Sequence, residues 1–269
     1  MQQSSFFKLT IPPDTCFFLQ QYFDQVLIVT VPRFLERQER VTQRLKGLDF
    51  KFFQGVDKLN LDTSRAKRTN VYDEKVAQQL QRQGKPLNPG EIACSLSHRM
   101  VYEKMISEGW KRILILEDDV LPVYSILSFL PGALQELPDD WELVYLGFLK
   151  HEKVTLGLKL KQFFYKIGSG LGLMKWDIKM VGNLLPKSYS RYLKTAGFHD
   201  CTHAYAITLE AAGKLLAAQT PVVYRADDLL SSMIMKGKLK AFVTDPKFFD
   251  QEIFHDGSAG SEIKEALLI

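Results

Sequence analysis

The first part of the chain consists of an apolar segment, a mainly polar segment and a second apolar segment, and this order predicts a β-α-β unit. The run QVLIVTV at residues 25–31 is short, rich in β-branched residues and followed by Pro32, which predicts a buried strand. Residues 33–46 place a few apolar residues among many charged ones and predict a surface helix. Residues 49–57 alternate in the manner of a second strand, so the chain opens as an α/β domain does.

A third predicted strand follows a polar segment and a helix. Residues 57–88 are polar and predict a loop or short helices. Residues 91–108 repeat apolar side chains at helical spacing after Pro89 and Gly90, which predicts a helix. The sequence KRILILEDDV at residues 111–120 then predicts a buried strand whose end carries three carboxylates.

The second half of the chain alternates between core strands and a basic segment. Residues 141–148 predict a core strand, and residues 203–219 predict a strand that turns into a helix. Residues 149–194 hold ten Lys and Arg residues against two acids and several glycines, which favours a mobile, basic insertion and not a separate domain. We therefore divide the chain into an N-terminal extension, 1–23, and one domain, 24–269.

Composition narrows the classes of protein. The net charge of +4, from 35 basic and 31 acidic residues, lacks the dense positive charge of a nucleic-acid-binding protein, so we expect no nucleic-acid partner. Three widely spaced cysteines without a CxxC pair favour a reducing cytosol. The apolar runs are shorter than the roughly 20 residues of a membrane-spanning helix, and the N-terminus lacks the pattern of a signal peptide. We expect a cytoplasmic protein, peripheral at most on the inner face of the cytoplasmic membrane.

The acidic cluster Glu117, Asp118 and Asp119 is the main candidate for chemistry. Open α/β sheets bind ligands beyond the carboxyl ends of their strands, and the cluster follows such a strand. Adjacent carboxylates repel one another unless a cation is present, and oxygen ligands suit Mg²⁺ or Mn²⁺, which also bind diphosphates. The alternative is a solvated acidic loop that caps neighbouring helices.

Several blocks together resemble one enzyme family. These are VPRFLERQERV at 31–41, PGEIACSLSH at 89–98, RILILEDDV at 112–120 and THAYAITLEAAGKLL at 202–216. In this order they resemble glycosyltransferase family 25, which includes bacterial lipooligosaccharide galactosyl- and glucosyltransferases and collagen galactosyltransferases. The resemblance covers roughly residues 24–255.

The resemblance implies an α/β fold of the GT-A type, formed as a single Rossmann-like domain with a basic insertion. It also implies a UDP-sugar donor, a divalent metal and inversion at the anomeric carbon. We expect Mn²⁺, or else Mg²⁺, bound by Glu117 and Asp119. His255 lies in the C-terminal sequence EIFHDGS, where many metal-dependent GT-A enzymes place a histidine that completes the metal shell.

The donor site is predicted from residues around the first strand. A guanidinium group can bind two phosphate oxygens at once through two parallel hydrogen bonds. The alternative is that these arginines are only solvated, as charged residues on a helix face often are. The family usually has Asn-Leu at the end of the first strand, where this chain has Thr30 and Val31. The predicted donor-binding residues are Thr30, Arg33, Arg37, Arg40, Asp118 and His203.

An inverting transferase needs a base that takes the proton of the acceptor hydroxyl. We expect this base in the pair Asp227 and Asp228, with Asp228 preferred, although Asp227 is also a candidate helix N-cap. His98 is placed near the sugar by the family resemblance, and a hydrogen-bonded core histidine is the alternative. Asp200 would orient a substrate or stabilise a turn.

The expected reaction transfers galactose from UDP-galactose, or as the second choice glucose from UDP-glucose. The acceptor would be an oligosaccharide or a lipid-linked saccharide of lipooligosaccharide or a similar glycan. The rivals are a metal-dependent nucleotidyl- or phosphotransferase, and a non-catalytic glycan-binding protein that retains the fold. The basic insertion suggests an acceptor that carries phosphates or an anionic membrane surface. Its aromatic residues Phe163, Phe164, Tyr165 and Trp176 would lie at the lipid interface or over the acceptor sugar.

Overall fold

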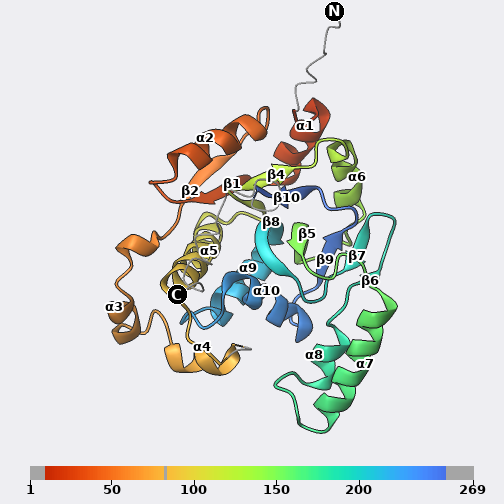
Figure 1. Ribbon diagram of the computed structural model, residues 1–269. Helices are drawn as coiled ribbons and strands as arrows, with labels where there is room; N and C mark the ends of the chain where they lie inside the picture. Colours follow the sequence, from red (N-terminus) through yellow and green to blue (C-terminus); the bar gives the residue numbers. More distant parts are fainter. Residues whose placement is uncertain (1–9, 82–83, 253–269) are drawn as a thin grey trace, which may run out of the picture.

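The protein is described here by a computed structural model that covers residues 10–81 and 84–252. A sheet in the order β2-β1-β3-β8-β5-β9-β7-β6 forms its centre, with helices on both faces (Figure 1). The strands are β1 Gln25–Thr30, β2 Lys51–Gln54, β3 Arg112–Glu117, β4 Val120–Pro122, β5 Leu143–Leu149, β6 Lys187–Ser188, β7 Leu193–Thr195, β8 Asp200–Thr208, β9 Ala241–Thr244 and β10 Phe249–Gln251. The α-helices are α1 Pro13–Tyr22, α2 Leu35–Arg44, α3 Thr63–Arg68, α4 Glu74–Leu80, α5 Pro89–Glu108, α6 Leu130–Gln135, α7 Leu156–Gly170, α8 Ile178–Gly182, α9 Leu209–Ala218 and α10 Ala226–Met235; the 3-10 helices are η1 Lys58–Asn60 and η2 Leu127–Phe129.

The sheet is mixed. Strands β2, β1 and β3 run parallel, β8 runs antiparallel to its neighbours β3 and β5, and β9 is parallel to β5. A separate antiparallel pair joins β4 to β10, which lies next to β5 and β8. The predicted α/β class and the predicted β-α-β opening are confirmed. The antiparallel β8 is the feature that periodicity did not reveal.

The central strand β3 shows how the sequence produces three layers. Successive side chains of a strand point to opposite faces of the sheet. Leu114 and Leu116 pack on one face with residues of α1, α2 and α6, whereas Ile113 and Ile115 pack on the other with residues of α5, α9 and α10. All four side chains have no exposed surface. The strand is therefore fixed on both sides, and its carboxyl end lies at the edge where open α/β sheets bind ligands.

Helix α5 begins and ends where the sequence predicts. Asn88 and Glu91 form a reciprocal capping box at its start, with Pro89 in the first turn. Gly109 follows its last residue at a φ of 68°, a left-handed conformation that favours glycine. The polar excursion before α5 contains the short elements η1, α3 and α4. Both predictions are confirmed, and the N-terminal half of α5 is held against the carboxyl edge of the sheet.

The basic segment 149–194 is more regular than predicted. It contains the helices α7 and α8 and the β6–β7 hairpin, and β7 pairs with β9 at the edge of the main sheet. Three of the glycines that suggested breaks, Gly157, Gly168 and Gly170, lie near the two ends of α7, and residues 158–167 between them contain neither glycine nor proline. Thr155 caps the helix, since its Oγ1 accepts the Leu158 N–H at 3.3 Å.

Helix α1 packs on the same core as the sheet. Its Cys16 and Leu19 belong to the hydrophobic cluster that contains Leu114 and Leu116. The proposed division of the chain at residues 23 and 24 stays a prediction. Among residues 10–81 and 84–252, the structure has no helix that combines enough length with enough apolar character to cross a membrane.

Candidate active site

A cavity of about 160 Å³ lies beyond the carboxyl ends of β1 and β3. These parallel strands end at the same edge of the sheet, and α5 and the loop after β2 form the other walls. The loop passes so close to α5 that a Cβ on Gly55 would lie 2.4 Å from Ser97 Oγ, which accepts the Val56 N–H. Of the predicted site residues, the cavity brings together Thr30, Arg33, Arg37, His98, Glu117, Asp118 and Asp119.

Asp118 has protein partners on both carboxylate oxygens. Thr30 donates its hydroxyl hydrogen to Oδ2 at 2.6 Å, and Arg37 Nη1 donates to Oδ1 at 3.0 Å. Burial raises the pKa of Asp118, and these two partners act against that rise. Asp118 therefore holds Thr30 at the end of β1 and Arg37 on α2, and the Thr30 hydroxyl hydrogen is used in this contact.

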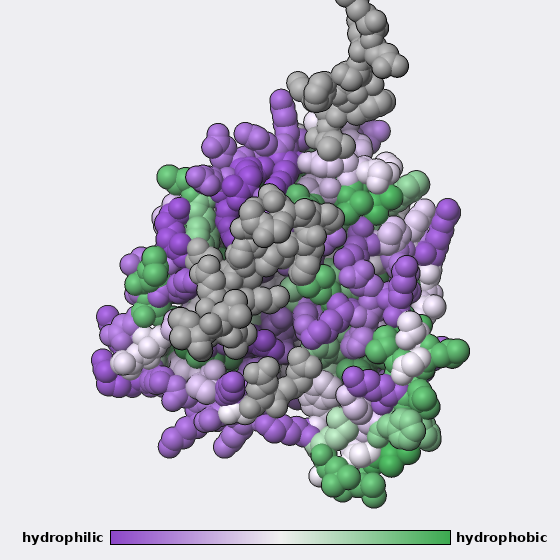
Figure 2. All heavy atoms as spheres, viewed as in Figure 1, coloured by the Kyte–Doolittle hydropathy of each residue, from purple (hydrophilic) through white to green (hydrophobic). Residues whose placement is uncertain are grey.

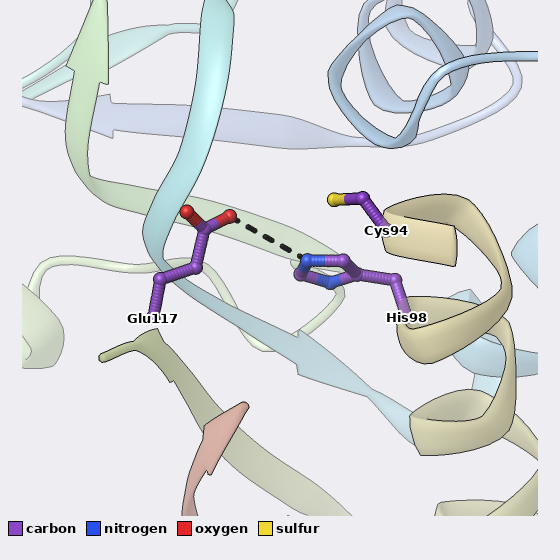
Figure 3. Close-up of side chains that lie close together, drawn as sticks. All are labelled: Cys94, His98 and Glu117. Atoms are coloured by element: carbon purple, nitrogen blue, oxygen red, sulfur yellow. Dashed lines mark ion pairs between the residues drawn. The ribbon is translucent and has the colours of Figure 1, made fainter. Parts of the chain in front are cut away.

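Glu117 faces α5 and β8. Its Oε1 accepts a hydrogen bond from the Thr202 hydroxyl at 2.5 Å and lies 3.5 Å from His98 Nε2. Burial opposes ionisation of Glu117, but the contacts with His98 and Thr202 and the charge of His203 outweigh it and lower the pKa. Figure 3 shows Glu117 and His98 pointing toward each other, with the Cys94 thiol beside them.

Tyr205 orients the imidazole of His98. Its hydroxyl lies 2.7 Å from His98 Nδ1 and 3.1 Å from the Tyr102 hydroxyl, so a buried chain of polar groups runs under the site. This arrangement leaves His98 Nε2 to face Glu117 and the cavity. His98 thus lies in the site and is also a hydrogen-bonded core residue, which combines both interpretations of the sequence.

Asp119 has a carboxylate oxygen without a partner. Gln251 Nε2 donates to Oδ2 at 3.0 Å, whereas the buried Oδ1 makes no hydrogen bond with a described residue. Burial raises the pKa of Asp119, and the charges of Glu117 and Asp118 raise it further, to about 7. A buried carboxylate that lacks partners is costly unless a cation compensates it.

These residues can hold a divalent cation. The oxygens of Glu117 and Asp119 are the hard donors that Mn²⁺ and Mg²⁺ prefer, and the unpartnered Asp119 Oδ1 supplies a free ligand atom. Cys94, His98 and Glu117 also offer ligand atoms within 4.8 Å of one another (Figure 3). The second set includes a thiol and suits softer ions such as Zn²⁺. Both sets share Glu117.

Arg33, just before α2, and Arg37, in its first turn, border the same cavity. Arg33 Nε donates to Asp57 Oδ2 at 2.8 Å, and both guanidinium groups lie over the Phe34 ring, at 4.2 and 4.8 Å from its centroid. The ring and the carboxylates hold the two planar groups in fixed positions. Such an arrangement suits phosphate oxygens.

Arg40 lies outside this cavity. Its Nε is 3.2 Å from Glu252 Oε1, which also accepts a hydrogen bond from Arg44 Nη2 at 2.7 Å. Glu252 is buried, and its backbone N–H donates to the Asp119 carbonyl. Arg40 and Arg44 thus attach the strand β10 to α2.

Asp227 and Asp228 lie in the first turn of α10. The N-cap of this helix is Arg225, so Asp227 is not the cap that the sequence suggested as an alternative. Arg225 Nε donates to Asp228 Oδ2 at 2.7 Å, and Asp227 Oδ2 accepts the Cys201 N–H at 3.2 Å. Burial and the charge of Asp228 raise the pKa of Asp227 to about 6, against the influence of Arg225.

The start of β8 brings the aspartate pair close to the acidic cluster. Cys201 has a φ of 69°, a conformation that costs free energy in a residue with a side chain. Burial raises the pKa of its thiol, and the charges of Glu117 and Asp227 raise it further. The strained residue therefore lies between the carboxylates of β3 and α10.

Asp200 and His203 lie on β8 outside the cavity of about 160 Å³. Asp200 forms an ion pair with Lys150, and its buried Oδ1 has no hydrogen-bond partner among the described residues. His203 is fully buried against Gly147, where a Cβ would lie 2.4 Å from its Nε2. Burial lowers the pKa of His203. Neither of its ring nitrogens finds a hydrogen-bond partner within residues 10–81 and 84–252.

Several site residues were not predicted, among them Cys94, Tyr205 and Gln251, and one prediction falls outside the described residues. Cys94 lies one helical turn before His98, a spacing that sequence analysis can detect. Tyr205 and Gln251 gave no comparable indication, because their roles depend on how β8 and β10 pair. His255 lies outside the described residues.

Two further cavities extend from α10 to α7. Asp228 lines one of about 330 Å³, which shares Leu80, Lys175, Trp176 and Phe198 with another of about 440 Å³. The larger cavity is also lined by Lys150 and Lys161. A hollow with apolar walls and several lysines thus connects Asp228 with the basic segment.

An α/β protein with carboxylates and arginines beyond the ends of parallel strands has the arrangement typical of enzymes that bind nucleotides. The family assignment agrees with this class. Residues 23–230 match the model of glycosyltransferase family 25, described as LPS biosynthesis protein. The chain belongs to that family, which confirms the resemblance found in the sequence.

Relatives include both enzymes and proteins named inactive. Procollagen galactosyltransferase 2 of Mus musculus is 26% identical over 206 residues, which are 73% of this chain and 28% of that protein. Inactive glycosyltransferase 25 family member 3 of Homo sapiens is 29% identical over 208 residues, 73% of this chain and 29% of that protein. A glycosyltransferase 25 family member of Anopheles gambiae is 29% identical over 196 residues, 68% and 27% of the two chains. The chain thus spans less than a third of the length of these relatives.

Proposed function

We propose that the protein transfers a hexose from a UDP-sugar to a saccharide hydroxyl with inversion, with galactose as the first choice of sugar and glucose as the second. The reaction would serve the assembly of lipooligosaccharide or a similar surface glycan. The observation that carries this proposal is the buried Asp119 Oδ1, which has no hydrogen-bond partner among the described residues and lies in the cavity that Glu117, Asp118, Arg33 and Arg37 also line. The family description as LPS biosynthesis protein and the relatives named galactosyltransferases support the choice of donor and acceptor. A GT-A type fold is part of the proposal and is supported by the acidic cluster at the tip of β3.

Glu117 and Asp119 would hold Mn²⁺, or else Mg²⁺. Bound there, such an ion neutralises the negative charge that develops on the departing diphosphate. Arg33 and Arg37 border the same cavity and would bind phosphate oxygens of the donor. Asp118 keeps Arg37 in place through its 3.0 Å contact, so its role in donor binding is to position that arginine.

Asp228 stays our proposed base because it lines the cavity that leads toward the basic segment. A base must lie within hydrogen-bond reach of the acceptor hydroxyl, and the geometry comes before the pKa. Asp227 is the alternative, since its pKa of about 6 suits proton transfer near neutral pH. Arg225, which binds Asp228, would hold that carboxylate in one orientation.

The cavities of about 330 and 440 Å³ are the proposed acceptor path. Trp176 and Phe198 line both, and aromatic surfaces of this kind pack against the apolar faces of sugars and lipid chains. Lys161 and Lys175 would attract phosphate groups on the acceptor.

The proposal is tested by incubating the protein with UDP-galactose, UDP-glucose or UDP-GlcNAc, Mn²⁺ and a lipooligosaccharide core acceptor. Release of UDP and the mass of the product are measured. We expect hexose addition, fastest with UDP-galactose. Release of pyrophosphate or phosphate in place of UDP would favour a nucleotidyl- or phosphotransferase. No release from any donor, with intact glycan binding, would favour a non-catalytic protein like the relatives named inactive.

A further inference from the structure

Helix α7 exposes an apolar stripe to the outside of the protein. A helix turns by about 100° per residue, so Leu156, Leu160, Phe163, Phe164, Ile167 and Leu171 fall within a stripe about 100° wide. Their exposed fractions are 84, 58, 57, 59, 46 and 69%. Figure 2 shows hydrophobic residues gathered on the lobe that α7 and α8 form at the lower right of Figure 1.

The opposite face of α7 attaches the helix to the domain. Leu158 and Tyr165 pack on a cluster of buried residues that includes Leu184, Phe198 and Met235. Gln162 Nε2 donates to the Val181 carbonyl at 2.7 Å, and Ser169 donates its hydroxyl hydrogen to the Trp176 carbonyl at 2.7 Å. The helix is thus held with its apolar stripe facing outward, opposite to the usual orientation of a surface helix.

The same contacts refine the prediction for the aromatic residues of this segment. Tyr165 and Trp176 pack against the inner cluster of α7 and α8, so they do not belong to the outer stripe. Phe163 and Phe164 do belong to it, and their rings lie edge to face with centroids 5.8 Å apart. The outer surface is therefore made by two aromatic and four aliphatic side chains.

Lysines flank the stripe on both sides. Lys159 and Lys166 lie on one side of it and Lys161 on the other, and residues 156–170 contain no acid. An apolar face bordered by lysines is the pattern of helices that lie in the interface of a membrane, where the aliphatic stems are buried and the ammonium groups contact anionic headgroups. The helix of 15 residues is about 22 Å long, too short to span a bilayer.

We propose that α7 docks this protein on the surface of an anionic lipid bilayer, with the stripe Leu156 to Leu171 inserted among the headgroups and the lysines bound to lipid phosphates. A second copy of the chain fits less well, because two facing α7 helices would bring six lysines together without a carboxylate from either helix. The inference rests on the surface of α7 and does not depend on the proposed reaction.

Sedimentation with vesicles tests this docking. Vesicles of phosphatidylcholine with about one third phosphatidylglycerol are mixed with the protein at about 0.1 M salt, where charge screening is incomplete. We expect binding that falls at least about tenfold with Phe163→Ser and Phe164→Ser combined, since much of the inserted apolar area is lost. The combination Lys159→Ser, Lys161→Ser and Lys166→Ser should weaken binding and remove most of its dependence on salt.

Matched controls separate this outcome from a change in the fold. Phe17→Ser removes an exposed phenylalanine on α1, and the combination Lys46→Ser, Lys51→Ser and Lys75→Ser removes three exposed lysines outside α7. Both should bind vesicles as the unmodified protein does. The proposal is wrong if the unmodified protein does not bind, or if the α7 variants bind as well as the controls. Sedimentation velocity without lipid gives a further test: a dimer lost in the Phe163 and Phe164 variant would assign the stripe to self-association.

Discussion

The carboxyl edge of the sheet and the outer face of α7 are both unusual, because the first buries a polar group and the second exposes apolar ones. At the edge, Asp119 Oδ1 is buried and has no hydrogen-bond partner in the part of the chain that the structure describes. On α7, six large apolar side chains are exposed, and acidic residues are absent from the helix. Folded proteins usually avoid both arrangements because each costs free energy. Both departures support our proposals that a partner outside the chain completes each region, a cation with its nucleotide in one case and a lipid surface in the other.

The largest expected effect is loss of transfer in Asp119→Ala. The variant removes a proposed metal ligand but leaves the buried residues of β3 in place, so we expect activity to fall by about a thousandfold or more. Turnover is measured at saturating donor, alongside the melting temperature. The exposed Asp139→Ala should behave as the unmodified protein. Near-normal activity with unchanged metal dependence would contradict the role of Asp119.

The next effect concerns the base. Asp228→Asn should lower kcat by about a hundredfold while the KM for the donor changes little, the size expected for loss of a general base. Asp227→Asn is the comparison, because the two residues are adjacent on α10 and only Asp228 has the ion pair with Arg225. If Asp228→Asn keeps its turnover and Asp227→Asn, Asp200→Asn or His98→Ala loses it, the base is assigned wrongly.

The next prediction compares the loss of stability when a buried phenylalanine and an exposed phenylalanine of α7 are replaced. Phe248 is fully buried, so Phe248→Ser should lower the free energy of unfolding by at least about 3 kcal/mol. Phe164 is more than half exposed, so Phe164→Ser should change it by less than about 0.5 kcal/mol. Urea unfolding of both variants measures the difference. A large cost for Phe164→Ser would show that the stripe packs on the domain and is not free for a bilayer.

The smallest expected effect is a gain in stability for Asp227→Asn. The pKa of Asp227 is raised by burial to about 6, so its ionised form destabilises the fold above that pH. The folded protein gains stability as the pH falls through about 6, until the unfolded chain also binds the proton near pH 4. The variant should therefore be more stable by about 1–2 kcal/mol at pH 7.5, with the gain reduced to about a third of that at pH 4.5. A melting temperature that is lower than normal at both pH values would contradict this account.

Much of the fold was predictable because its main elements have strong local patterns. The run of aliphatic residues in β3 and the Asn88 to Glu91 box at α5 each specify an element and its end. The acidic cluster was visible because it follows β3 directly. The metal set of Glu117 and Asp119 stays a prediction, and so do the donor and base assignments.

Other features depended on contacts that a single sequence does not show. The glycines of α7 suggested loops because their position near the helix ends was unknown. The same uncertainty hid which aromatic residues of this segment face outward. The left-handed Cys201 and the contact of Tyr205 with His98 depend on the pairing of β8 with β3 and β5. Arg40 looked equivalent to Arg33 and Arg37 in sequence, but it forms an ion pair with Glu252, the residue after β10.

Direct binding of Mn²⁺ tests the central claim, that the acidic cluster at the tip of β3 holds a divalent cation for the nucleotide. Free Mn²⁺ is titrated by electron paramagnetic resonance with the protein alone and with UDP present. We predict about one ion bound per chain, tighter with UDP, and at least about tenfold weaker in Asp119→Ala than in Asp139→Ala. Equal binding by the two variants, or binding that is lost only when Cys94 is replaced by Ser, would contradict the assignment of the site.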